Sequence, residues 1–156
     1  MKSKIVHFST GHVRNELRVH LKQCHSLAEA GFNVTFVTCD GMGDDDSGDI
    51  QVIDIGKPKG RLHRFFWVPI LMFFALKKTK ADLYHFHDPE LIFLGLLLQM
   101  SGNIVIYDVH EDVPRSILSR DWIPSPIRSL ISKVFEYFEN TCAARFSGIV
   151  CATAEI

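Results

Sequence analysis

Two short apolar runs, each followed by histidine or acidic residues, constrain the fold of this chain most strongly. The run Leu83–Phe86 is followed by His87 and Asp88, and the run Ile104–Val109 is followed by His110. Both runs have the length and the aromatic or β-branched content of buried strands, and roughly 15 residues of helical pattern separate them. Strands joined by a helix are parallel, and parallel sheets bind ligands beyond the carboxyl ends of their strands. The sequence therefore predicts a functional cleft at this edge of a sheet.

Strand-like and helix-like segments alternate along the rest of the chain, with no internal repeat and no linker. The expected strands are 5–8, 34–37, 51–55, 83–86, 104–109 and 149–152. Helices are expected over 15–31, in a stretch reaching residue 80 that Pro69 kinks or restarts, over 89–100 and from Ser125 onward, whereas 113–124 is expected to be irregular. This pattern predicts an α/β fold with a Rossmann-like, doubly wound, mainly parallel six-stranded sheet in three α/β/α layers. The expected strand order is 3-2-1-4-5-6.

The composition is that of an ordinary globular domain. The chain has 156 residues, of which 47% are hydrophobic and 22% are charged, and a formal net charge of −1 gives no reason to expect a nucleic-acid partner. The 4 cysteines lack C-x-x-C spacing, as expected of free thiols in a reducing compartment. The longest apolar run, 65–76, is shorter than the roughly 20 residues that cross a bilayer. We therefore expect a cytoplasmic protein.

The loop after the first expected strand contains Gly11 but neither a G-x-G-x-x-G nor a G-x-x-x-x-G-K motif. This disfavours a dinucleotide cofactor and a nucleoside triphosphatase. Gly11 either lets a ligand approach the backbone closely or simply makes a turn. Arg14 and Arg18, near the start of the next helix, either attract an anionic group such as a diphosphate or are solvated helix charges.

The histidines at the strand ends allow two interpretations. His85 and His87 face the same side of their strand, so together with Asp88 they form a candidate metal site. Alternatively, His87 and Asp88 line the cleft and His85 packs below them. At the next strand end, Asp108 is expected to orient His110, which is suited to bind a sugar hydroxyl or to act as a base, although loop-capping carboxylates are the plainer interpretation. No further histidine or cysteine follows at ligand spacing, so we expect neither metal nor cofactor.

Basic residues at 57–64 and 77–80 flank the aromatic run that begins at Phe65. Such a stretch either rests on an anionic membrane surface or packs on the sheet with its lysines reaching solvent. Because both faces of a parallel sheet need a cover, we expect the apolar residues to be buried and reserve membrane contact for the basic end. The residues expected in the core are Phe65, Phe66, Leu71, Phe74 and Ala75.

Several segments resemble the amino-terminal domain of a family 4 glycosyltransferase with the GT-B fold. They are the helix–strand junction at 26–38, the strand at 81–91 that ends in His-Asp-Pro-Glu, the next strand at 105–111 and the last strand at 148–153. The resemblance covers nearly the whole chain. Glu16 stands where family members often carry Asp, and the carboxyl-terminal domain that binds most of the nucleotide sugar in this family is missing.

The resemblance implies that 1–156 is a single domain, the acceptor-side half of a two-domain retaining enzyme of polysaccharide biosynthesis. Such an enzyme moves a sugar from a nucleotide-sugar donor to a glycan or lipid-linked acceptor without a metal, and the present piece alone is expected to be inactive. From the composition and the basic residues before Phe65, and not from the resemblance, we expect a cytoplasmic location with a peripheral contact at the inner membrane face.

The resemblance also assigns roles to residues. His110 would be the catalytic residue near the reacting centre, and Gly11 and His12 would touch the donor diphosphate or the sugar. The acceptor side would be shaped by Arg18, His87, Asp88, Asp108 and Glu111. Two other functions stay open: a stand-alone α/β ligand-binding or interaction domain, and a metal-dependent hydrolase using His85, His87, Asp88 and His110.

Overall fold

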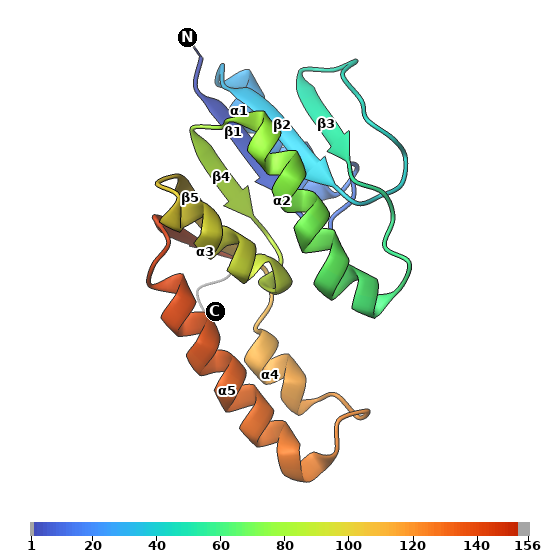
Figure 1. The fold of residues 1–156 in the computed structure, drawn as a ribbon, viewed down its shortest axis with the longest axis vertical. Coiled ribbons are helices and arrows are strands. Elements are labelled where there is room, and N and C mark those ends of the chain that lie inside the picture. The colour runs from blue at the N-terminus through green and yellow to red at the C-terminus, as the bar shows by residue number, and fades with distance from the viewer. Residues whose placement is uncertain (1, 153–156) are drawn as a thin grey trace.

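The computed structural model describes residues 2–152, which form a six-stranded sheet flanked by helices (Figure 1). The sheet order is β3-β2-β1-β4-β5-β6, and every neighbouring pair is parallel. The predicted fold class and strand order are confirmed. The strands are β1 (Lys4–Phe8), β2 (Asn33–Thr38), β3 (Ile50–Asp54), β4 (Leu83–Phe86), β5 (Ile104–Val109) and β6 (Gly148–Cys151).

The chain reverses direction across the sheet at β1. It runs outward from β1 through β2 to β3 and then returns to β4 on the other side of β1. A reversal of this kind leaves a crevice between the loops that follow the two central strands, which is where ligands bind in open α/β sheets. The loops after β1 and β4 therefore define the place to look for a site.

The helices follow the sequence pattern, with differences at their ends. The Glu16 carboxylate accepts a hydrogen bond from the backbone N–H of Val19 at 2.6 Å, so the first helix begins after Glu16 and not at Asn15. Pro69 lies in the first turn of α2, as expected of a restarted helix. The helical segments are η1 (Leu17–Cys24), a π-helical stretch, α1 (His25–Glu29), η2 (His63–Trp67), α2 (Val68–Thr79), η3 (Pro89–Leu91), α3 (Ile92–Met100), α4 (Val113–Leu118) and α5 (Ser125–Ala143).

The segment 113–124, expected to be irregular, contains the helix α4. The side chain of Asp112 accepts a hydrogen bond from the backbone N–H of Arg115 at 3.0 Å, and Pro114 occupies the first turn. A capping carboxylate followed by a proline is a helix start, so the prediction for this segment was wrong.

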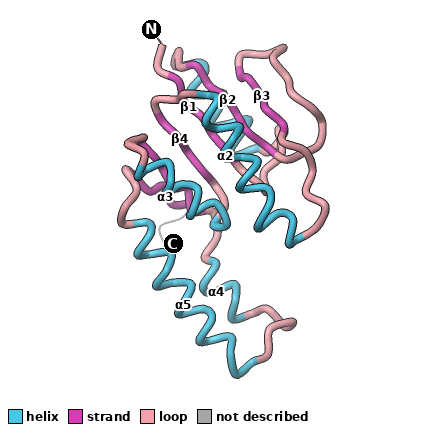
Figure 2. The backbone as a smooth tube through the Cα atoms, in the orientation of Figure 1, coloured by secondary structure: helices cyan, strands magenta, loops and turns pink. Residues whose placement is uncertain are grey.

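The two faces of the sheet are covered unequally (Figure 2). Helices α2 and α3 pack on one face, where Phe8, Phe86 and Tyr107 are buried among helix residues such as Met72. Helix α3 lies so close to the sheet that a Cβ on Gly95 would come within 2.7 Å of the Phe86 ring. The opposite face is covered over β2 and β3 by η1 and α1 through a second, smaller core of Val19, Cys24, Val34, Phe36, Ile50 and Val52.

Most of the residues expected in the core from the aromatic run are exposed, which corrects the sequence expectation. Phe65, Phe66 and Phe74 are 54%, 66% and 60% exposed, and Leu71 is exposed as well; only Ala75 is partly buried. The sheet-facing side of α2 is formed by Val68, Met72, Leu76 and Thr79, whose helical spacing leaves the bulky aromatics on the outer side. None of the helices within residues 2–152 is long and apolar enough to span a membrane.

Helices α4 and α5 pair with each other and project beyond the end of the sheet (Figure 1). The apolar side of α5 is therefore largely uncovered: Ile127, Leu130, Ile131 and Val134 are exposed. Phe135 and Phe138 are half-buried, and burial is complete only at Ser132, Glu139 and Cys142. The apolar spacing predicted the helix correctly but not what it packs against.

Candidate active site

The loop after β1 is held in place by the carboxylate of Asp88, which directly follows β4. The Ser9 hydroxyl donates to Asp88 Oδ2 at 2.6 Å, and the backbone N–H of Thr10 donates to the same oxygen at 2.8 Å. The Ser9 oxygen in turn accepts hydrogen bonds from the backbone N–H groups of Gly11 and His12, at 3.1 and 2.8 Å. Asp88 is buried, and its hydrogen bonds to Ser9 and Thr10 fix the loop after β1 as one wall of the crevice.

Gly11 lies where two side chains pass close to the backbone. A Cβ at this position would lie 2.8 Å from both Arg64 Nη2 and Asp88 Oδ1, closer than real side chains come. The sequence left open whether Gly11 serves a turn or a close approach. The structure shows a close approach, made by residues of the protein itself.

Arg64, from η2, reaches the same crevice and was not recognised as a site residue from the sequence. Its Nε donates to Glu90 Oε1 at 2.6 Å, and its Nη2 lies 3.4 Å from Asp88 Oδ1. The Arg64 side chain keeps 37% of its surface exposed, so the guanidinium remains accessible. In the sequence Arg64 is one of several basic residues before the aromatic run, and no local spacing marks it as different from its neighbours.

Asp108, near the end of β5, lies behind the histidines. Its side chain is fully buried; Oδ1 accepts a hydrogen bond from Arg18 Nη2 at 2.8 Å, and Oδ2 accepts one from Gln23 Nε2 at 2.7 Å. The same Oδ2 lies 3.3 Å from His110 Nε2 and 3.4 Å from His87 Nδ1. The structure thus brings Asp108, His87 and His110 together, with Arg18 and Gln23 supporting the carboxylate from helix η1.

Hydrogen bonding keeps this carboxylate ionised. Burial alone would raise the pKa of Asp108, but the hydrogen bonds from His110, His87 and Gln23 outweigh it and hold the pKa well below its ordinary value. Asp108 therefore carries a negative charge at neutral pH, and it faces two imidazole nitrogens, His110 Nε2 and His87 Nδ1, which are within hydrogen-bond distance of each other at 3.1 Å.

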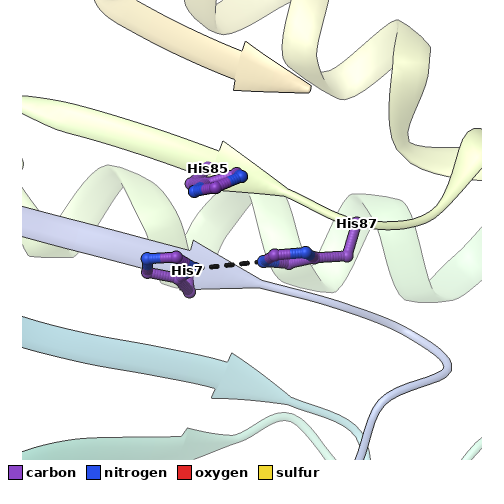
Figure 3. Close-up of side chains that lie close together, drawn as sticks. All are labelled: His7, His85 and His87. Carbon is purple, nitrogen blue, oxygen red and sulfur yellow. Dashed lines mark hydrogen bonds between the residues drawn. The ribbon is translucent and has the colours of Figure 1, made fainter. Parts of the chain in front are cut away.

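Three histidines form a buried layer beneath the crevice (Figure 3). His7 of β1 lies opposite His85 in the parallel register of β1 and β4, and His87 follows at the end of β4. Nδ1 of His7 and Nε2 of His87 are 3.0 Å apart. Burial lowers the pKa of all three histidines, to about 3 for His85, so each ring is neutral at physiological pH.

His110 and His12 lie above this layer, at the wall of an open cleft. Their ring centroids are 4.6 Å apart, and both side chains are partly accessible. The cleft has a volume of about 360 Å³. It is lined by His12, Arg64, His87, Asp88, Pro89, Glu90, Tyr107, His110, Glu111, Val113 and Arg120.

Most of the residues predicted from the sequence meet at this cleft. His12, His87, Asp88, His110 and Glu111 line it, whereas Arg18 and Asp108 lie behind it and Gly11 lines the neighbouring hollow.

Arg14, an alternative anion ligand, instead pairs with Asp40: its Nε donates to Asp40 Oδ2 at 2.7 Å. Arg120 joins Arg64 as a second cation at the cleft that the sequence did not indicate, because it follows α4, a helix that was not expected.

Two groups of side chains within residues 2–152 have ligand atoms close enough to hold a metal ion. One is His7, His85 and His87; the other is His87, Asp108 and His110. Asp88 belongs to neither, because its carboxylate is engaged by the loop after β1. The set considered from the sequence for a metal hydrolase, which included Asp88, is therefore not assembled in the described residues.

Comparison with known proteins supports the family and the fold. The sequence model of the protein family Glycosyltransferase Family 4 matches residues 18–156. Sucrose-phosphate synthase from Thermosynechococcus elongatus has a similar structure, with a TM-score of 0.62 and 13% identity over 96% of this chain and 47% of that chain. The glycotransferase of kitacinnamycin gives a TM-score of 0.53 and 12% identity over 90% of this chain and 40% of that chain.

At these identities the structural likeness concerns the fold alone. The chain spans about half or less of the length of the two solved structures. A search of curated proteins finds no significant match.

Proposed function

Because this chain belongs to glycosyltransferase family 4, we propose that it is the acceptor-side, amino-terminal domain of a two-domain retaining glycosyltransferase. The enzyme moves a sugar from a nucleotide-sugar donor to a glycan or a lipid-linked acceptor, as in polysaccharide biosynthesis. The donor is held between this domain and a carboxyl-terminal domain, so 1–156 alone is inactive. One observation carries the proposal: His110 borders an open cleft while Asp108 holds its inner nitrogen.

The ring of His110 is the polar group best placed to act on the transferred sugar or the acceptor. Its Nε2 lies 3.3 Å from the Asp108 carboxylate, which fixes the ring orientation and favours a proton on that nitrogen. The other ring nitrogen, Nδ1, then carries a lone pair that accepts a hydrogen bond from a sugar hydroxyl. A pre-oriented polar group of this kind lowers the barrier without moving when the reaction occurs. No cofactor takes part in this proposed step.

The loop after β1 contributes to the cleft through the His12 side chain and not through its backbone N–H groups. The N–H groups of Gly11 and His12 both donate to the Ser9 oxygen, so they are not free to bind a phosphate. His12 reaches the cleft through its ring, beside His110. Arg120 supplies positive charge at the cleft for a diphosphate or a phosphorylated acceptor, whereas the guanidinium of Arg64 is paired with Glu90 and Asp88.

The experiment that tests this function uses the complete natural protein and a panel of nucleotide sugars. His110→Ala should lower kcat/KM by roughly 10² or more, the usual contribution of a positioned acid–base or polar group, without changing the far-ultraviolet circular dichroism spectrum. His63→Ala serves as the control, because His63 is outside the cleft lining. Near-wild-type kinetics of a folded His110→Ala variant would remove His110 from the reaction.

An anionic membrane surface is the proposed location of the acceptor. Large apolar side chains are exposed on η2 and α2 and just before η2. The exposed fractions are 75% for Leu62, 66% for Phe66, 60% for Trp67 and 60% for Phe74. Exposed basic residues, Lys57, Lys59, Arg61, Lys77 and Lys78, flank this aromatic face. Aromatic side chains insert at the headgroup level and lysines and arginines attract the anionic lipids of the cytoplasmic leaflet. The combination supports a cytoplasmic protein bound peripherally at the inner membrane face.

A further inference from the structure

The buried histidine layer below the cleft has properties that the proposed sugar transfer does not use. His7 is fully buried and His85 is 8% exposed, and both occupy the sheet face that η1 and α1 approach. Ring centroids within the layer are 4.5 Å apart for His7 and His85 and 4.7 Å apart for His85 and His87. Burying three polar imidazole rings together is costly unless their nitrogens are bonded, so the cluster calls for a bonding partner.

Hydrogen bonding within the protein does not satisfy these rings. The short contact between His7 Nδ1 and His87 Nε2 holds a single proton, whichever ring donates it. The Nε2 atoms of His7 and His85 are buried and have no hydrogen-bond partner among the described residues. Proteins leave few buried polar atoms unpaired, so two in one cluster indicate that something other than a side chain completes it.

We propose that His7, His85 and His87 bind a divalent transition-metal ion of the zinc class. Imidazole nitrogen is a preferred ligand of Zn²⁺, and three histidines with one open position are a known ligand set for it. The candidate nitrogens lie within 4.8 Å of one another. Nitrogen ligands of a tetrahedral zinc ion are roughly 3.3 Å apart, given bonds of about 2.0–2.1 Å, so only small side-chain shifts are needed.

The surroundings of the cluster match those of metal sites. All three rings are buried, and each offers one ring nitrogen to the same small volume. Nδ1 of His87 lies 3.1 Å from His110 Nε2 and 3.4 Å from Asp108 Oδ2, while its Nε2 points at His7. A carboxylate behind a ligating histidine is the usual way in which its metal-binding nitrogen is selected and oriented.

An entry path and a place for a fourth ligand are also present. A cavity of about 440 Å³ opens beside His7 and His85, between the sheet and α1, and is otherwise lined mainly by apolar side chains such as Leu27 and Ile106. A water molecule in this cavity can complete the coordination. The second candidate group, His87, Asp108 and His110, is less suited, because a cation there would compete with Arg18 for the Asp108 carboxylate at 2.8 Å.

The test is metal binding by the purified protein without any sugar donor, so its outcome is independent of the proposed transferase activity. After treatment with a chelator and dialysis, the protein is titrated with Zn²⁺ and, separately, with Co²⁺ as a spectroscopic probe. We expect one equivalent of Zn²⁺ to be retained and Co²⁺ to give the visible absorption of a low-coordinate nitrogen site. His7→Gln and His85→Gln should each weaken binding at least 100-fold, and Asp108→Asn should weaken it 10- to 100-fold.

His63→Gln is the matched control and should bind Zn²⁺ as the wild type does, because His63 belongs to neither candidate group. Long-range ¹H–¹⁵N spectra of the wild-type histidine side chains decide the case even if a variant fails to fold. Zinc-induced shifts on the rings of His7, His85 and His87 support the site. Retention of no zinc, unchanged affinity in a folded His85→Gln variant, or shifts confined to His12 and His110 would overturn it.

Discussion

Replacing Asp108 with asparagine tests the centre of the site without changing its shape. Two hydrogen-bond donors and two imidazole nitrogens face this carboxylate: Arg18 donates to Oδ1, Gln23 donates to Oδ2, and His87 Nδ1 and His110 Nε2 lie 3.4 and 3.3 Å from Oδ2. An asparagine has one acceptor oxygen and one donor NH₂ group. If its oxygen faces the Oδ2 partners, its NH₂ group is directed at the Arg18 guanidinium. One donor-to-donor contact is therefore unavoidable, and a cation loses its buried partner.

The free-energy cost follows from the burial of the two partners. Breaking a buried ion pair by removing one charge costs about 3–5 kcal/mol, because the remaining charge is left without compensation. Asp108 is fully buried, but the Arg18 side chain is 32% exposed and can recover part of its hydration. We therefore expect Asp108→Asn to lower the free energy of unfolding by about 3 kcal/mol, at the lower end of that range. In a domain of this size the melting temperature would fall by roughly 6–12 °C.

The same variant makes a prediction about pH. Because the pKa of Asp108 is lower in the folded protein than in the unfolded chain, its stabilisation is complete above about pH 4, the unfolded pKa. It is lost as the pH falls from there toward the folded-state pKa. The stability difference between wild type and Asp108→Asn should thus be constant from pH 7 to about 5. It should then shrink below about pH 4, by up to about 1.4 kcal/mol per pH unit.

Chemical denaturation of both proteins at a series of pH values measures this difference. Asp46→Asn is the control, because Asp46 is exposed and should change stability by less than about 0.5 kcal/mol. A difference below 1 kcal/mol at pH 7 would refute the argument that Asp108 is an ionised, buried centre of the network. A difference that stays constant down to pH 3 would refute its depressed pKa.

Three further predictions concern the loop, the aromatic face and the size of the active unit. Gly11→Ala should destabilise the fold by about 1–3 kcal/mol in urea denaturation, since its Cβ would press on Arg64 and Asp88 at 2.8 Å. Reversing Lys57, Lys59 and Arg61 to Glu should weaken co-sedimentation with anionic vesicles on the order of 100-fold, because each basic contact contributes about 1 kcal/mol. Arg64 is left unchanged in that variant because it is paired with Glu90 in the cleft. Residues 1–156 alone should transfer no radiolabelled sugar, since under the proposed function the donor is positioned between two domains.

Each of these has a matched comparison. Gly48→Ala should be nearly neutral, because a Cβ there meets nothing within 4 Å; equal effects at both glycines would contradict the crowding argument. Reversal of the exposed Lys22, Lys133 and Arg145 should leave vesicle binding largely intact, and failure of the wild type to bind at low salt would end the membrane proposal. Sugar transfer by 1–156 at rates near those of the complete protein would contradict the two-domain requirement.

The parallel sheet and the position of the cleft could be predicted because they depend on local patterns. Alternating strand and helix segments permit few topologies once right-handed crossovers are required. The same pattern put Asp88, His87 and His110 at one edge. Arg64 was missed because its partner Glu90 is 26 residues away and is reached only after η2 folds over the loop. His7 was missed because only the register of β1 against β4 sets it opposite His85.

The unexpected packing of α2 and that of α5 share a physical cause. The run from Phe65 to Leu76 is apolar on nearly every side, so its sequence carries little information about which side meets the sheet. In α5 the apolar spacing is clear, but the helix projects past the sheet and meets α4 instead. Periodicity identifies a face that avoids water, whereas the element that covers this face is decided by the rest of the fold.

The attachment of the loop after β1 to Asp88 has a consequence for how the cleft comes into being. Ser9 and Asp88 are 79 residues apart in the chain, and their hydrogen bond sits beside the pairing of β1 with β4. Closing this long loop costs conformational entropy only once, because the hydrogen bond and the strand pairing form together. During synthesis on the ribosome the amino-terminal loop therefore has no anchor until β4 has emerged, and the crevice then forms in the same cooperative step as the centre of the sheet. Fluctuations that open the crevice must in turn disturb the middle of the sheet, so the site is expected among the last backbone amides to exchange with solvent.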